Sequence, residues 1–174
     1  MKQNLKYIIP AIILLLGIFG VFSHRFDLTK EKRYTLSDAT VETLKSVKEP
    51  LTVEVYLEGD FPASFKQLQN ETQFLLEEFR KINPKIDYKF IDPIATKMSQ
   101  DTLQAMGMQP SMLPDMKDGK VSQIVLFPYA ALKYKGYGTS ISLITNQMGI
   151  DAAEQLTKSI ENLEFNFAST IKSL

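Results

Sequence analysis

The feature that most constrains this chain is an uncharged run of sixteen residues near its N-terminus, Tyr7–Phe22. As a helix, this run rises about 24 Å, slightly less than the hydrocarbon core of a bilayer. Lys6 and Arg25 flank it, and their aliphatic stems can extend it to the two interfaces. A core helix is apolar along one stripe, whereas this segment is apolar on every side. The run therefore predicts a transmembrane helix within an N-terminal membrane anchor, residues 1–25.

A cleaved signal peptide is the alternative interpretation of the same segment. Lys2 lies in a basic n-region, and Val21 and Ser23 are small residues at which a cleavage site is conceivable. Phe22 and Arg25 make a poor cleavage region, which favours a retained anchor. Basic residues lie on both sides of the run, so charge alone does not orient it in the membrane.

The composition excludes several functional classes. The chain has no Cys, which excludes disulfide scaffolds, Cys-ligated metal sites and thiol catalysis. His24 is its single histidine, so the side chain most used for proton transfer near neutral pH is nearly absent. Residues 26–174 carry 17 basic and 20 acidic residues, which does not favour binding to nucleic acid. We expect a non-enzymatic protein without a metal ion or cofactor.

Beyond a polar juxtamembrane linker at 26–35, the sequence alternates strand and helix patterns. Helices are expected to begin near residues with N-capping side chains, namely Ser37, Ser64 and Asp151. A further helix is expected around Ser99–Met106, with Gly107 as its C-terminal stop. The helix that follows Asp151 is expected to continue to the end of the chain. Strands are indicated by apolar residues at period two and by turn residues at their ends. The expected strands are Leu51–Leu57, Ile86–Phe90, Val121–Leu126 and Thr139–Thr145.

The order of these elements predicts one α/β domain over residues 36–174. Val121–Leu126 and Thr139–Thr145 are expected to pair as an antiparallel hairpin, and Met108–Lys120, which holds two prolines, is expected to be a loop. A βαβ crossover followed by such a hairpin gives a mixed sheet. The predicted fold class is thus an N-terminal transmembrane helix followed by a thioredoxin-like β-α-β-α-β-β-α domain with a mixed sheet.

Few residues are candidates for chemistry. Asp87 and Asp92 lie near the second expected strand, and Asp92 follows its carboxyl end, where ligand crevices form in α/β sheets. An Asp before a proline is also typical of a turn, which is the interpretation we favour. Gly136-Tyr137-Gly138 lies between strands and so lacks the strand–loop–helix context of a phosphate-binding loop. We assign no catalytic, cofactor-binding or metal-binding residue.

Methionines are concentrated in one segment of the chain. Five of the seven lie within nineteen positions: Met98, Met106, Met108, Met112 and Met116. Flexible, polarizable Met side chains suit adaptable protein contacts, although packing of a loop on the core explains them equally. The segment Met108–Met116 is therefore a candidate contact surface.

One sequence element resembles a known family. Arg33-Tyr34-Thr35-Leu36-Ser37-Asp38-Ala39-Thr40, placed after an apolar N-terminal run, resembles the gliding-motility-associated auxiliary subunits of ABC transporters, which are often described as substrate-binding. The similarity extends along residues 1–174. Its other stretches are Leu44-Lys45, Glu49-Pro50-Leu51-Thr52-Val53, Leu75-Leu76-Glu77-Glu78-Phe79 and Phe90-Ile91-Asp92-Pro93.

The resemblance implies a location and partners. It implies a single-pass protein of the cytoplasmic (inner) membrane, with its domain on the extracytoplasmic side. The implied partners are a multispan ABC permease and, through the permease, a cytoplasmic ATPase. Members of that family are longer, so this chain looks like an N-terminal portion, and the transported substrate stays unknown. The alternative function is a substrate receptor that binds a small molecule or peptide. A degenerate hydrolase or redox enzyme is a third hypothesis, which the sequence favours least.

Overall fold

The computed structural model describes residues 35–117, 120–145, 147 and 149–174. The expected membrane anchor at 1–25, with Tyr7–Phe22, and all of the linker except Thr35 lie outside these residues. The chain divides into two units, Met1–Thr35 and Leu36–Leu174. Among the described residues, no helix combines the length and the apolar character needed to cross a membrane.

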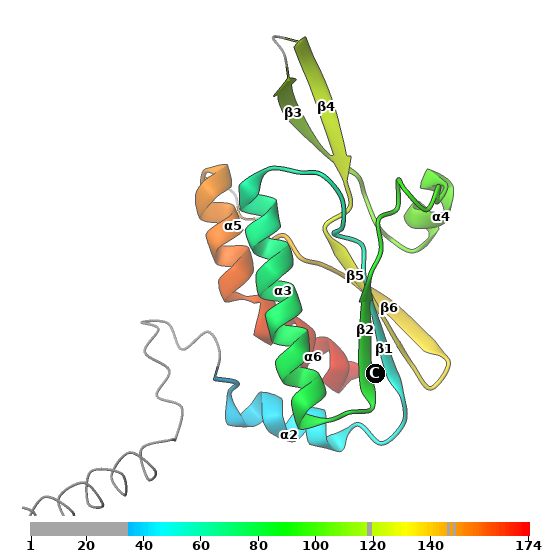
Figure 1. The fold of residues 1–174 in the computed structure, drawn as a ribbon. Helices are drawn as coiled ribbons and strands as arrows, with labels where there is room; N and C mark the ends of the chain where they lie inside the picture. Colours follow the sequence, from blue (N-terminus) through cyan, green and yellow to red (C-terminus); the bar gives the residue numbers. More distant parts are fainter. Residues whose placement is uncertain (1–34, 118–119, 146, 148) are drawn as a thin grey trace, which may run out of the picture. The chain divides into compact units, whose positions relative to one another are not determined.

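A four-stranded mixed sheet forms the centre of the second unit, in the order β2-β1-β5-β6 (Figure 1). Its strands are β1 (Leu51–Val55), β2 (Ile86–Phe90), β5 (Tyr129–Tyr134) and β6 (Tyr137–Ser142). β1 is parallel to β2 and antiparallel to β5, and β5 is antiparallel to β6. Lys135 and Gly136 join β5 to β6 with φ angles of 51° and 82°. Two consecutive positive φ angles match the twist of a tight hairpin.

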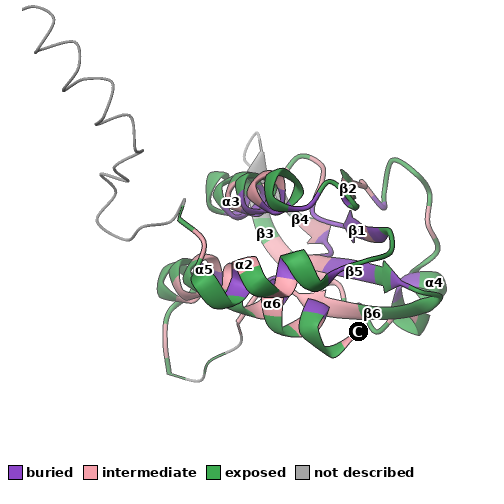
Figure 2. Ribbon diagram, turned by 90° about the horizontal axis from the view of Figure 1, so that it is seen from below, coloured by how far each residue is buried: buried purple, intermediate pink, exposed green. Residues whose placement is uncertain are grey.

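Four helices cover one face of this sheet (Figures 1 and 2). They are α2 (Asp38–Ser46), α3 (Ala63–Ile82), α5 (Ala152–Glu161) and α6 (Leu163–Ser173). Alternate residues of β1, Leu51, Val53 and Val55, point toward these helices and are almost fully buried. Phe79 of α3 and Phe167 of α6 are completely buried in the same core. The larger core therefore lies between the helices and the sheet.

The opposite face of the sheet is covered at one end by α4 (Gln100–Ala105) (Figure 1). Tyr56 and Ala131 from the sheet side pack there with Leu103 of α4 and with Met108 and Phe127. Gly107 ends the helix with a φ of 79°, as the sequence predicts. The smaller core leaves much of the polar side of the sheet in solvent.

A two-stranded ribbon projects from the domain beyond the carboxyl ends of β1 and β2 (Figure 1). Its strands are β3 (Ser111–Lys117) and β4 (Lys120–Leu126), which pair with each other in an antiparallel register. The prediction of a loop over Met108–Lys120 is therefore wrong. Pro114 lies within β3, opposite Gln123, and proline is tolerated in a strand that has one open edge.

The predicted fold class is also wrong. The β-α-β-α-β-β-α order lacks the strand β3 and the separate sheet that it forms with β4. The predicted hairpin of Val121–Leu126 with Thr139–Thr145 does not form, because β4 pairs with β3 and β6 pairs with β5. β5, which follows Pro128, is a further strand that the predicted order lacks. The predicted transmembrane helix, Tyr7–Phe22, lies outside the described residues, and none of the helices among them could cross a membrane.

Two of the three predicted helix caps are confirmed, and Ser99 is a cap that was not predicted from the sequence. The side chains of Ser37, Ser99 and Asp151 each accept a hydrogen bond from a backbone N–H of the first turn of α2, α4 and α5. α3 instead begins after Pro62, without a side-chain cap, so the capping box predicted at Ser64 is wrong. The expected long C-terminal helix is broken at Asn162 into α5 and α6.

Candidate functional site

The principal candidate site is a cleft of about 450 Å³ at the carboxyl ends of the parallel strands β1 and β2. Ligand crevices of open α/β sheets form at this edge. Three segments line the cleft, namely residues 56–61 after β1, residues 92–94 after β2 and residues 123–127 around the end of β4. The base of the projecting ribbon is therefore one wall of the cleft.

Gly59 allows two walls of the cleft to approach each other. Its φ is +138°, a conformation that side-chain-bearing residues rarely adopt. A Cβ atom at this position would lie 3.4 Å from Oδ2 of Asp92 and 3.9 Å from Cδ1 of Phe61. A side chain here would strain the backbone and reduce the space between the segments that follow β1 and β2.

Asp92 has the turn role that its sequence context favours. Its Oδ1 accepts hydrogen bonds from the backbone N–H groups of Ile94, at 2.8 Å, and Ala95, at 2.9 Å. Its own carbonyl oxygen accepts a bond from the Thr96 hydroxyl at 2.6 Å. These bonds fix the turn after β2, and the same carboxylate also lines the cleft.

An ammonium group contacts two of the residues that line the cleft. Nζ of Lys66, from the first turns of α3, is 4.0 Å from Oε1 of Glu58 and 5.3 Å from the ring centroid of Phe61. Gln69 donates a 2.6 Å hydrogen bond to the other carboxylate oxygen of Glu58. The carboxylate is thus satisfied within the chain, and the cleft suits a small ligand with apolar surface.

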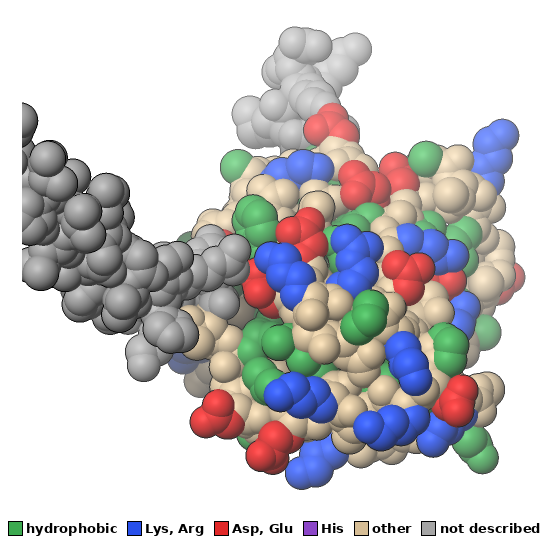
Figure 3. Space-filling model, turned by 60° about the horizontal axis from the view of Figure 1, so that its bottom comes forward, with side chains coloured by type: hydrophobic (Ala, Val, Ile, Leu, Met, Phe, Trp, Pro, Cys, Tyr) green, Lys and Arg blue, Asp and Glu red, His purple; other side chains and the backbone are tan. Residues whose placement is uncertain are grey.

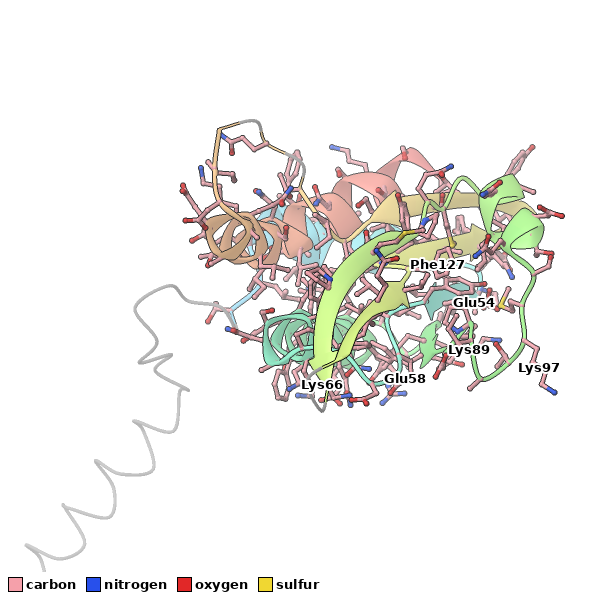
Figure 4. The ribbon with its side chains drawn as sticks, turned by 90° about the horizontal axis from the view of Figure 1, so that it is seen from above. Glu54, Glu58, Lys66, Lys89, Lys97 and Phe127 are labelled. Atoms are coloured by element: carbon pink, nitrogen blue, oxygen red, sulfur yellow. The ribbon has the colours of Figure 1, made fainter. Side chains whose placement is uncertain are left out.

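A charged network lies on the polar face of the sheet. Glu54 of β1, 8% exposed, is 2.9 Å from Nζ of Lys89 on β2 and 2.8 Å from Nζ of Lys133 on β5. The Tyr56 hydroxyl donates to the same carboxylate at 3.1 Å. Figure 4 shows Glu54 and Lys89 together, with Lys97 well apart from them. One carboxylate therefore links three adjacent strands of the sheet, β2, β1 and β5.

The network shifts the pKa values of its members. Burial alone raises the pKa of Glu54, but the hydrogen bonds from Lys133, Lys89 and Tyr56 outweigh it and lower the pKa from 4.5 to about 2. Burial and the adjacent Glu54 charge raise the pKa of Tyr56 to about 12. Glu54 is therefore ionised and Tyr56 neutral across the physiological range, so neither group is poised for proton transfer near pH 7.

The remaining charged candidates have structural partners. Asp87 is 3.9 Å from Arg80, and Glu78 is 2.6 Å from Lys81. Glu77 accepts a 3.3 Å bond from Gln73. No group of three or more His, Asp or Glu side chains is placed to hold a metal ion within the part of the chain that the structure describes.

The methionine-rich segment divides into a buried part and an exposed part. Met108 is completely buried in the smaller core, and Met98 and Met106 pack against that core. Met112, on β3, is 60% exposed. The neighbouring Leu113 packs against the larger core. Of the candidate contact surface at 108–116, the exposed methionine that the structure describes is therefore Met112, near the base of the ribbon.

Comparison with protein families identifies the domain. Residues 30–133 match the family described as a domain of unknown function, DUF7088, and this stretch is more than half of the chain. The chain belongs to the DUF7088 family. The DUF7088 stretch contains α2, α3, α4, the ribbon, the cleft and all four members of the Glu54 network.

A curated relative extends the comparison. An uncharacterized protein of Borreliella burgdorferi is 26% identical over 162 residues, which is 91% of this chain and 32% of the relative. The DUF7088 chain thus spans about a third of the length of the curated relative it matches. Comparison with solved structures gave no match.

Two features of the site were not predicted from the sequence. Along β1, Glu54 stands between Val53 and Val55, which face the larger core. This alternation is the sequence signal that could have placed Glu54 on the opposite, polar face of the sheet. The register of β1 with β2 and β5 brings Lys89 and Lys133 to Glu54, and a sequence does not fix such a register. The cleft depends on the ribbon, which was expected to be a loop.

Proposed function

We propose that this protein is a non-catalytic extracytoplasmic subunit of an ABC transport complex associated with gliding motility at the cytoplasmic membrane. In this role it contacts a multispan permease and, through the permease, the cytoplasmic ATPase. The element Arg33–Thr40 and the other resembling stretches support the assignment to this class of complex. The observation that carries a contact role is the projecting ribbon with its exposed Met112.

The ribbon suits protein contact for two physical reasons. It pairs only with itself, so each strand presents an outer edge of backbone groups. An isolated two-stranded ribbon is marginally stable in water and gains stability from further packing. Met112 on β3 and Val125 on β4 are directly paired and so share one face of the ribbon. Val125 already packs against the smaller core, so a partner that covers this face would bury chiefly the exposed side chain of Met112.

Replacement of Met112 by Ser tests the contact role. We expect the unfolding free energy to change by less than about 0.5 kcal/mol, since the side chain is mostly in solvent. Association with the permease should weaken about tenfold if Met112 is an anchor of the interface. Pull-down of the full chain from membranes, with partners identified and quantified by mass spectrometry, measures the second effect.

Met108→Ser is the matched control. Met108 is completely buried, so this change should cost about 2–4 kcal/mol of folding stability. A photoreactive amino acid at position 112 should in addition cross-link to the permease in cells. Unchanged pull-down in Met112→Ser, together with no permease cross-link at 112, would rule out the ribbon as the contact.

The alternative function is a substrate receptor, and the cleft of about 450 Å³ is the observation that favours it. Val125 lines this cleft, and Val125→Trp should fill part of it. A receptor should copurify with a small molecule or peptide that mass spectrometry detects with the wild type and not with Val125→Trp. The same ligand bound to both proteins would exclude the cleft as its site.

A further inference from the structure

The domain has a second surface groove, separate from the ribbon and from the cleft. α2 and α6 pack against each other, and on their solvent side they enclose a groove of about 790 Å³. Ala39 and Thr43 line it from α2, and Ala168 and Ser169 line it from α6. Small side chains on both helices leave the hollow. Figure 3 brings forward the end of the domain where α2 lies in Figure 1, and shows hydrophobic side chains exposed among charged ones.

Phe165 makes this groove unusual. α6 buries Leu163, Phe167 and Ile171 on its core side, whereas Phe165 lies on the solvent side and is 71% exposed. A phenyl ring on the polar face of an amphipathic helix contributes little to folding. Beside a groove of small residues, the ring offers an apolar wall to an incoming side chain.

The charged side chains that line the groove indicate the charge that a partner should carry. Among the described residues that line it, Glu42 of α2, Glu161 at the end of α5 and Glu164 of α6 are acidic, and Lys172 is the single cation. Glu164 also accepts a 2.8 Å hydrogen bond from the backbone N–H of Ser37 and so ties the start of α2 to α6. The lining carries three carboxylates and one ammonium, which favours a cationic partner over an anionic membrane surface.

The dimensions of the groove fit a helix. α2 and α6 have nine and eleven residues. At 1.5 Å per residue they are about 14 and 17 Å long, which is roughly three turns. An amphipathic helix binds such a groove through apolar side chains at i, i+3 or i+4, and i+7. We infer that the α2–α6 groove is a docking site for an amphipathic helix of a partner protein that carries Lys or Arg beside its apolar face.

The test uses the full chain in phosphatidylcholine nanodiscs and two synthetic helical peptides of about four turns. The first peptide has Leu along one face, Lys on both flanks and a photoreactive residue in the centre of the Leu face. The second has Glu in place of every Lys. Irradiation followed by mass spectrometry locates the cross-links. The Lys peptide should cross-link to α2 and α6, and the Glu peptide should cross-link at least about tenfold less.

Two variants remove the features that carry the inference. Phe165→Ser should reduce the cross-linked fraction about tenfold, because the anchor wall is lost. Glu161→Lys should reduce it about threefold and make the residual cross-linking less dependent on salt. Both variants should fold, since Phe165 is mostly exposed and a cation is favourable at the last residue of a helix. Phe74→Ser and Asp87→Lys are matched controls at exposed positions on α3 and β2, and should leave cross-linking unchanged.

Four results would overturn the inference. The first is cross-linking of the Lys peptide outside α2 and α6, and the second is equal cross-linking of this peptide to Phe165→Ser and to the wild type. The third is equal cross-linking of both peptides. The fourth is a wild-type dimer in sedimentation experiments that Phe165→Ser dissociates, because the occupant would then be a second copy of the chain. Met112→Ser should not affect the cross-linking. A negative result for helix docking in the groove can therefore be told apart from a negative result for permease contact through the ribbon.

Discussion

Replacement of Phe79 by Ala is expected to lower the free energy of unfolding by about 3–5 kcal/mol. Phe79 is completely buried between α3, α6 and the sheet, so the change removes a full phenyl ring from the larger core. The ring of Phe167 lies edge-on to it, with 6.3 Å between centroids and an interplanar angle of 89°. Denaturant unfolding of the full chain, followed by circular dichroism, measures the change.

A matched control lies on the same helix. Phe74 of α3 is 46% exposed, and Phe74→Ala should cost less than about 1 kcal/mol. Phe167→Ala should resemble Phe79→Ala. The double variant should cost less than the two single costs together, by roughly 0.5–1.5 kcal/mol, because the edge-to-face contact is lost only once. A change within about 0.5 kcal/mol for Phe79→Ala would place this ring outside the core.

Elements with strong local signals are predictable from this sequence. α2 and α5 begin directly after Ser37 and Asp151 because these side chains accept hydrogen bonds from first-turn N–H groups, and such bonds depend on neighbouring residues alone. β1 is recognisable because apolar residues alternate with Thr52 and Glu54. The long helix α3 follows from its apolar stripe, although its start after Pro62 does not.

Elements that depend on distant pairing were missed. β3 contains Pro114 and follows Pro110, and both residues indicate a loop when local preference is read alone. Pairing with β4 outweighs that preference, because a strand with one free edge has room for a residue that donates no hydrogen bond. The cleft was missed for the same reason, since the base of this ribbon is one of its walls.

Replacement of Glu54 by Gln is expected to lower the unfolding free energy by roughly 2–3 kcal/mol near pH 7. The variant keeps the shape of the side chain and an acceptor for the Tyr56 hydroxyl, and it removes the charge that Lys89 and Lys133 share. Both lysines are more than half exposed and can be solvated again, so the cost lies below that of breaking a fully buried pair. Glu78→Gln, which affects only the exposed pair with Lys81, should cost less than about 0.5 kcal/mol.

The effect of Glu54→Gln should depend on pH with a definite sign. The folded-state pKa of Glu54, about 2, lies below its ordinary value of 4.5, so its contribution is complete above pH 4.5 and is lost as the pH falls toward 2. The stability difference between wild type and Glu54→Gln should therefore be constant from pH 6 to 8 and shrink below pH 4.5. Urea unfolding of both proteins at a series of pH values measures this difference. A difference that stays the same at low pH would show that packing, and not the shared charge, makes Glu54 important.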